Sequence, residues 1–147
     1  MYASVQQFLE KEITQQIDAM LTQKQVLLIA AALGFLGVAL GAFGAHALKD
    51  ILTVNRRLDT YELAVRYHFY HTFALFTVGM MMDKFSGSGF KLSAFLFLIG
   101  IVLFSGSLYA LCLLNITMIA VITPIGGVFL IAGWATLFVA VFKATKT

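Results

Sequence analysis

The sequence predicts an all-α, polytopic membrane protein: an antiparallel bundle of four transmembrane helices, preceded by an N-terminal amphipathic helix. Two observations predict this class. Hydrophobic residues make up 61% of the 147 residues and charged residues 12%, whereas soluble domains average about 45–50% apolar and about 25% charged residues. The apolar residues are also gathered into four stretches of roughly 20 residues, the length that crosses a hydrocarbon core of about 30 Å.

We expect the spans at about 26–48, 64–82, 92–114 and 119–142, within a transmembrane domain that covers residues 23–147. The connections between them are short, and short connections between neighbouring helices favour an antiparallel, up-down-up-down bundle. A Gly/Ser turn joins the second span to the third, and a short uncharged turn joins the third to the fourth.

Residues 1–22 have a different pattern. Apolar residues recur there at nearly helical spacing, separated by charged and amide side chains, which predicts an amphipathic helix too polar to span a membrane. These apolar residues are Val5, Leu9, Ile13, Ile17 and Leu21. Such a helix lies on the membrane surface or packs on a partner. The alternative is a tail added upstream of a start at Met20.

Lysine and arginine residues indicate the orientation, because cytoplasmic loops carry an excess of both. Those on the side of the two termini are Lys11, Lys24, Lys84, Lys91, Lys143 and Lys146. Those on the opposite side are Lys49, Arg56, Arg57 and Arg66. The difference is small and favours both termini in the cytoplasm.

Glycines form a stripe along the first span. They are spaced three, four and three residues apart, so they share one face of the helix, and small residues at such spacing let two transmembrane helices approach closely. The stripe consists of Gly34, Gly37, Gly41 and Gly44. We expect it to pack inside the bundle rather than between two copies. Gly106, Gly126 and Gly127 are also assigned to helix packing.

The polar residues left in the apolar stretches gather at one level of the predicted bundle. With alternating span directions they fall in the half of the bilayer that faces away from the cytoplasm, and polar groups there tend to face the protein interior. The candidate ligand-binding residues are His46, Tyr67, Tyr70, His71, Ser105, Ser107, Tyr109 and Thr123. His68 shares a helix face with His71. Thr123 before Pro124 also fits the start of a helix.

Three interpretations of these polar residues stay open. Imidazole can bind a metal, relay a proton or ligate haem, but tyrosine and histidine near the end of a span are also ordinary interfacial residues. We favour a structural polar cluster, then a ligand or proton site, and last a metal site. No carboxylate lies in any predicted span, which weakens the proton and metal interpretations. We therefore assign no metal and no cofactor.

Several motifs together resemble those of one protein family. They are Gly41-Ala-Phe-Gly-Ala-His46-Ala-Leu48, Arg66-Tyr67 with Tyr70-His71, Phe104-Ser-Gly-Ser-Leu-Tyr109, and Thr123-Pro-Ile-Gly-Gly127 with Gly133-Trp134. They resemble the small bacterial inner-membrane family of unknown function whose eukaryotic relative is transmembrane protein 256, from about Met20 to the C-terminus. The resemblance implies four transmembrane helices in a bacterial cytoplasmic membrane, or in a mitochondrial inner membrane for the eukaryotic branch. Because position 68 is often Gln in that family, it also implies that His68 is not a required ligand.

No motif of a known enzyme class occurs, so we expect no enzymatic activity. A net charge of +3 without a long basic block gives no indication of nucleic-acid binding, and the single Cys112 excludes disulfides within one chain. The first hypothesis is a membrane protein that stabilises, assembles or accompanies a larger membrane system, as a subunit of a complex or as a homo-oligomer in the lipid bilayer. The second is a small-molecule or lipid binding or transport module with a polar cleft on the non-cytoplasmic side. The third and weakest is a bis-histidine haem protein.

Overall fold

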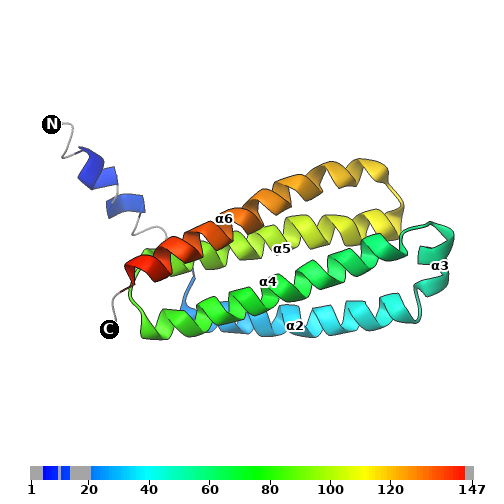
Figure 1. Ribbon diagram of the computed structural model, residues 1–147, viewed down its shortest axis with the longest axis horizontal. Coiled ribbons are helices and arrows are strands. Elements are labelled where there is room, and N and C mark those ends of the chain that lie inside the picture. Colours follow the sequence, from blue (N-terminus) through cyan, green and yellow to red (C-terminus); the bar gives the residue numbers. More distant parts are fainter. Residues whose placement is uncertain (1–4, 10, 14–20, 145–147) are drawn as a thin grey trace.

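A computed structural model describes residues 5–9, 11–13 and 21–144. Four long helices lie side by side, and a short helix lies at one end of them (Figure 1). The long helices are α2 (Gln23–Ala45), α4 (Leu58–Lys84), α5 (Ser88–Leu114) and α6 (Ile122–Lys143). The short helix α3 (Lys49–Val54) precedes α4, and a 3-10 turn, η1 (Thr117–Val121), precedes α6.

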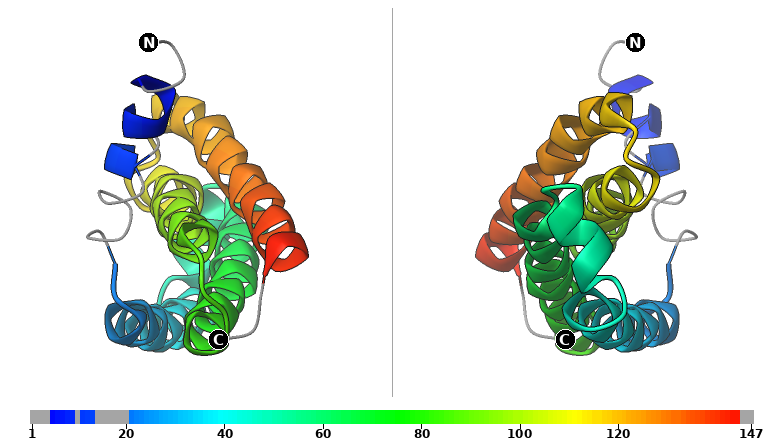
Figure 2. Two further views of the ribbon diagram at one scale, coloured as in Figure 1. Left: turned by 90° about the vertical axis from the view of Figure 1, so that its left-hand side faces the viewer. Right: turned by 90° about the vertical axis from the view of Figure 1, so that its right-hand side faces the viewer.

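Consecutive long helices run in opposite directions, so the start of α2 and the end of α6 lie at the end of the molecule opposite α3 (Figure 1). Each long helix packs mainly on the next one in the chain: α2 on α4, α4 on α5, and α5 on α6. Viewed end on, α2 and α6 lie on opposite sides of the molecule (Figure 2). The described part of the chain therefore forms an open helix layer, and not a closed bundle in which α6 would return to α2.

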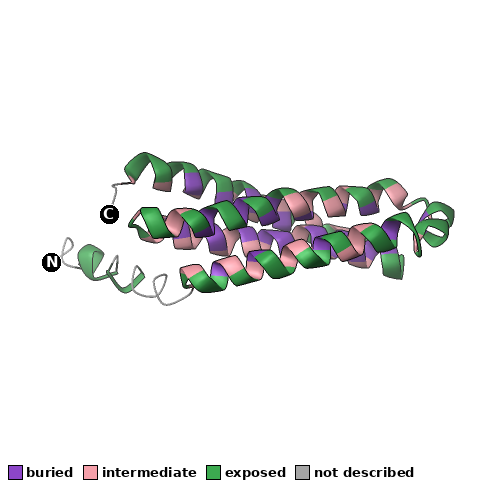
Figure 3. Ribbon diagram, turned by 90° about the horizontal axis from the view of Figure 1, so that it is seen from below, coloured by how far each residue is buried: buried purple, intermediate pink, exposed green. Residues whose placement is uncertain are grey.

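The distribution of buried residues follows from this order of the helices. The central helices α4 and α5 hold most of the buried residues, whereas α2 and α6 hold four each. Buried residues concentrate where helices face one another, and exposed residues cover the outer faces (Figure 3). On those outer faces Phe35 is 74% exposed and Phe138 73%. Soluble proteins rarely expose apolar faces of this extent, whereas a bilayer covers them.

Three helical segments are long and apolar enough to cross a membrane: Gln23–Ala45, Ser88–Leu114 and Thr117–Lys143. Helix α4 is as long as α5, with 27 residues in each, but it is more polar. Its residues His68 and His71 are buried against the other helices instead of facing outward. The chain is thus a polytopic membrane protein with three candidate spans and one further long helix.

The helix ends differ from the predicted ones for local reasons. Helix α2 begins at Gln23, three residues earlier than predicted, because Thr22 and Gln25 form a capping box. It ends at Ala45, and the predicted connection after it instead contains α3 and the first turn of α4. The Gly/Ser turn between α4 and α5 is shorter than predicted, and it contains Gly87 at φ 142°, which only glycine adopts easily.

The entry into α6 also differs. Asn115 ends α5 in the left-handed conformation, at φ 54°, which asparagine tolerates better than most residues. The chain then passes through η1 directly into α6, whose N-cap is Val121. Thr123 is therefore not a cap, and its hydroxyl lies 2.8 Å from the Ser107 hydroxyl instead. The helical approach to this span thus begins in η1, before Thr123.

The amphipathic helix predicted for residues 1–22 lies largely outside the described residues. Residues 5–9 and 11–13 are helical, and their apolar side chains are exposed, whereas Leu21 is not helical and directly precedes Thr22, the N-cap of α2. Ile17, on which the predicted pattern also depends, lies outside the described residues.

The glycine stripe of α2 faces α4. A methyl group built on any of the four glycines would come within 4 Å of an α4 side chain. The pairs are Gly34 with Thr72, Gly37 with Phe69, Gly41 with Val65, and Gly44 with Tyr61. At Gly44 the methyl group would overlap the tyrosine ring. The stripe therefore packs two helices of the same chain together.

Glycines also bring α6 against α5. A methyl group on Gly126 would overlap the backbone of Phe104, and one on Gly127 would make an ordinary contact of 3.7 Å with the Phe104 ring. A methyl group on Gly106 would have no atom of another helix within 4 Å, so this contact does not support its assignment to helix packing. Two glycines not assigned from the sequence, Gly100 and Gly133, do pack in this interface, against Leu130 and Phe97 respectively.

We expect Gly126→Ala to destabilise the protein, because the added methyl group meets backbone atoms, which cannot rotate away. Overpacking of this kind costs about 1–3 kcal/mol. Gly106→Ala is the matched control, since its methyl group meets no other atom within 4 Å, and it should leave stability unchanged or slightly raised. The measurement is the thermal unfolding midpoint in one detergent. Equal midpoints for the two variants would contradict the close contact between α5 and α6.

Candidate functional site

A polar cluster joins α2, α4 and α5 between the middle of the helix layer and its α3 end. Its central residue is His68 of α4, which is 4% exposed. The Nε2 atom of His68 lies 2.9 Å from the carbonyl oxygen of Leu33 in α2, and its Nδ1 atom lies 3.3 Å from the hydroxyl oxygen of Tyr109 in α5. Because a carbonyl oxygen only accepts, Nε2 carries the proton and Nδ1 accepts from Tyr109. Protein groups therefore occupy both ring nitrogens.

Tyr61 makes a second link between α4 and α2. Its hydroxyl donates to the carbonyl oxygen of Leu40 at 2.8 Å, and its ring meets the ring of Tyr109 edge-on, with centroids 5.2 Å apart. A side chain at Gly44 would occupy the space of the ring. The sequence analysis missed Tyr61 because it precedes the predicted span, among charged residues. Its spacing could have identified it, because Tyr61 lies seven residues before His68 and hence on the same helix face.

Hydroxyl groups join α5 to α6. Ser107 donates to the carbonyl oxygen of Phe104 at 2.9 Å, so the Thr123 hydroxyl, 2.8 Å away, donates to Ser107. In the other half of the layer, the Ser93 hydroxyl donates to the carbonyl oxygen of Gly133 at 2.9 Å. Ser93 was not among the predicted residues, although it faces a glycine of α6 just as Tyr61 faces one of α2.

His71 is surrounded by aromatic rings. Its Nδ1 atom lies 2.8 Å from the carbonyl oxygen of Tyr67, one turn earlier, so Nδ1 carries the proton. Its ring meets those of Tyr67, Phe97 and Trp134, with centroids 5.7, 5.9 and 6.3 Å apart. Tyr67 in turn stacks on Phe104 at 4.6 Å. His71 therefore connects α4 to both α5 and α6 by ring packing, and its Nε2 atom makes no hydrogen bond to the described residues.

The structure separates His46 from this cluster. His46 directly follows α2 and is exposed. The ring of His68 bonds to the carbonyl group of Leu33, thirteen residues before His46 in the chain, and thirteen residues of helix correspond to about 20 Å along the axis. The expected convergence of His46 with His68 and His71 is not found. Among the described residues there is also no group of three potential metal ligands.

Tyr70 and Ser105 do not join the hydrogen-bonded cluster either. Tyr70 is 59% exposed, because it lies on the outward face of α4, where its ring meets only that of Tyr67 at 6.2 Å. Ser105 is 1% exposed, but its hydroxyl has no hydrogen-bond partner. Of the predicted residues, the structure therefore packs Tyr67 against His71 and joins Ser107 to Thr123, whereas Tyr109 bonds to His68 instead.

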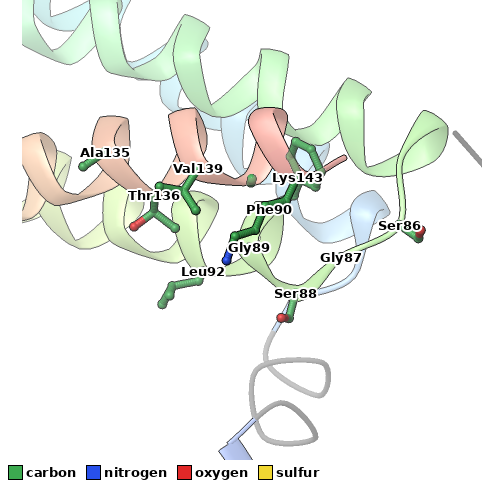
Figure 4. A pocket seen from close by; sticks show the side chains of 11 residues that line it. Ser86, Gly87, Ser88, Gly89, Phe90, Leu92, Ala135, Thr136, Val139 and Lys143 are labelled. Atoms are coloured by element: carbon green, nitrogen blue, oxygen red, sulfur yellow. The ribbon is translucent and has the colours of Figure 1, made fainter. Parts of the chain in front are cut away.

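Two grooves lie at opposite ends of the helix layer. The larger one, about 550 Å³, lies between the first turns of α5 and the last turns of α6 (Figure 4). Among the described residues its lining is mainly small or apolar, and Lys143 is the one titratable residue that this part of the chain contributes. The second, about 390 Å³, lies between α2 and α4 at the α3 end, and three charged residues line it. Neither His68 nor His71 lines either groove, and Tyr61 is the cluster residue that borders the second one, so the two histidines belong to a helix contact and not to the wall of a cleft.

We expect His68→Leu to destabilise the protein by about 1 kcal/mol, the usual size of a hydrogen bond between membrane helices. His68→Gln should keep most of the stability, because the amide group can donate to Leu33 and accept from Tyr109. His46→Leu is the control, since His46 is exposed. Unfolding midpoints in one detergent compare the three variants. A loss in His46→Leu as large as that in His68→Leu would contradict the cluster as described.

Comparisons with known proteins agree with the membrane fold. The sequence matches the family described as "Protein of unknown function (DUF423)" over residues 40–127. The UPF0382 membrane protein YwdK of Bacillus subtilis is 42% identical over 121 residues, which cover 82% of this chain and 98% of that protein. The UPF0382 inner membrane protein YgdD of Escherichia coli K12 is 37% identical over 126 residues, which cover 86% of this chain and 95% of that protein.

No solved structure matches this chain. The resemblance predicted from the sequence motifs is confirmed by the family match and by these relatives. The chain belongs to the UPF0382 (DUF423) family of bacterial membrane proteins, whose function is unknown.

Proposed function

We propose that this protein is a non-enzymatic, four-span protein of the bacterial cytoplasmic membrane that stabilises, assembles or accompanies a larger membrane system. One observation carries the proposal: the hydrogen-bonded polar side chains of the interior are used to connect helices. Tyr61 and His68 bond to carbonyl groups of α2, and Ser93 bonds to a carbonyl group of α6. Bonds of this kind hold a scaffold together and leave little polar chemistry for a substrate.

The outer faces of α2 and α6 support an accessory role. They are the edges of the open helix layer, and each helix has only four buried residues. The charged residues of these helices are Lys24 and Lys143, both in a terminal turn. The remaining outer surface is apolar and suits contact with lipid or with the helices of a partner.

We include α4 as the fourth span. It lies between α2 and α5 and is antiparallel to both. If α4 did not cross the membrane, the end of α2 and the start of α5 would lie on the same side of it. These two points lie at opposite ends of the layer instead. Its polar side chains His68 and Thr72 are buried, as polar groups in a membrane usually are. The excess of cations beside the termini supports an orientation with both termini in the cytoplasm.

A polar cleft that binds or transports a small molecule has less support. Both ring nitrogens of His68 bond to protein groups, and His46 and Tyr70 are exposed outside the cluster. The Nε2 atom of His71, which makes no hydrogen bond to the described residues, is the remaining support for the cleft hypothesis. Retention of a small molecule that is lost in His71→Ala would favour the cleft over the structural cluster.

Cysteine labelling tests the topology. In a Cys112→Ala background, we expect Val54→Cys, at a position 80% exposed in α3, to react with a membrane-impermeant maleimide on intact cells. Ser86→Cys, in the turn before α5, should react only after the membrane is permeabilised. Labelling of both from the outside would contradict the crossing of α4, and a reversed pattern would contradict the orientation.

Native mass tests the accessory role. Extracted gently from its own membrane, the protein should have a mass that exceeds whole multiples of 16.1 kDa by the mass of at least one other protein. Deleting its gene should then lower the abundance of that partner's complex. A mass equal to whole multiples of the chain, together with unchanged membrane complexes after deletion, would contradict the proposal.

A further inference from the structure

The groove at the α3 end, which we name the α2–α4 groove, lies between the last turn of α2 and the first turns of α4 and has a volume of about 390 Å³. Its floor is apolar. Gly41 and Gly44 provide the space on the α2 side, and Val65 and the ring of Tyr61 form the α4 side. A methyl group on Gly41 would lie 3.5 Å from Val65, so a larger side chain there would fill the groove.

The rim of the groove is charged. It carries Lys49, Arg66 and Glu62, a net charge of +1, and all three residues are exposed. Within the described part of the chain, the side chains of Lys49 and Arg66 make neither an ion pair nor a hydrogen bond. Two cations without a protein partner beside an apolar floor suit an anion attached to a hydrocarbon chain.

The position of the groove in the membrane points to the source of such a ligand. The 23 residues of α2 form a helix about 35 Å long, close to the thickness of a hydrocarbon core of about 30 Å. The C-terminal end of α2, with Lys49 just beyond it, therefore lies at the level of the lipid head groups. Arg66 starts deeper, and long cationic side chains extend toward the head groups from such positions.

We infer that the α2–α4 groove binds one anionic phospholipid of the leaflet at the α3 end. The phosphate lies between Lys49 and Arg66, and an acyl chain lies along Gly41 and Val65. Glu62 opposes the anion and limits the affinity. The site needs α2 to cross the membrane, but it does not depend on the accessory role proposed above.

Native mass spectrometry of the protein released from nanodiscs of equal phosphatidylglycerol and phosphatidylcholine tests this site. We expect the parent protein to retain one phosphatidylglycerol. Lys49→Gln/Arg66→Gln should weaken retention by about five-fold for each cation removed. Lys24→Gln/Arg56→Gln is the matched control: it removes the same charge from exposed positions outside the groove and should retain the lipid.

Two further variants separate lipid binding from loss of fold. Glu62→Gln removes the opposing charge and should strengthen phosphatidylglycerol retention, an increase that a poorly folded protein would not show. Gly41→Ala keeps every charge and adds to the floor a methyl group in ordinary contact with Val65, at 3.5 Å, and it should weaken retention at an unfolding midpoint near that of the parent.

Three results would overturn the site. One is equal retention by Lys49→Gln/Arg66→Gln and its control. Another is equal retention of phosphatidylcholine and phosphatidylglycerol by the parent, since the charged rim would then select nothing. The third is displacement by excess inorganic phosphate, which would show that the groove binds the free ion and not the lipid.

Discussion

The close contact between α2 and α4 is the constraint on which the polar interior depends. The carbonyl groups of a helix are normally covered by its own side chains, so another helix reaches them only where those side chains are missing. The glycine stripe uncovers them, and Tyr61 and His68 then bond to Leu40 and Leu33. Once α4 is held in this way, His68 has its second nitrogen available for Tyr109 of α5. The contact between α2 and α4 thus positions His68 for its contact with α5.

Properties that depend on one helix at a time could be predicted from the sequence, and properties that depend on the neighbouring helix could not. Hydropathy and glycine spacing belong to the first kind, so the long antiparallel helices and the stripe were found. Membership of the polar cluster belongs to the second. His46 was included because it ends an apolar stretch, but the contact of α2 with α4 directs the ring of His68 to Leu33, thirteen residues away from His46. Tyr61 was left out because charged residues surround it, although Gly44 makes room for its ring.

The two sides of the α2–α4 contact differ in chemistry. On the inner side, His68 uses both ring nitrogens within the protein. An amide group at this position can make the same two bonds, so the geometry itself does not call for a ligand-binding imidazole. On the outer side, Lys49 and Arg66 border a groove with an apolar floor. One pair of helices therefore supplies both a closed contact that fixes the layer and an open surface that faces the lipid.

The open order of the helices has a consequence for how the chain is made. Every long helix packs mainly on its neighbours in the sequence, so each contact closes a short loop, and a fold rich in local contacts forms quickly. Helix α4, the most polar of the four, follows the helix whose uncovered carbonyl groups it needs. The donors of Tyr61 and His68 can therefore meet their acceptors in α2 before α5 and α6 are in place. The helices can then be added in the order of synthesis, as Tyr109 of α5 completes the bonds of His68.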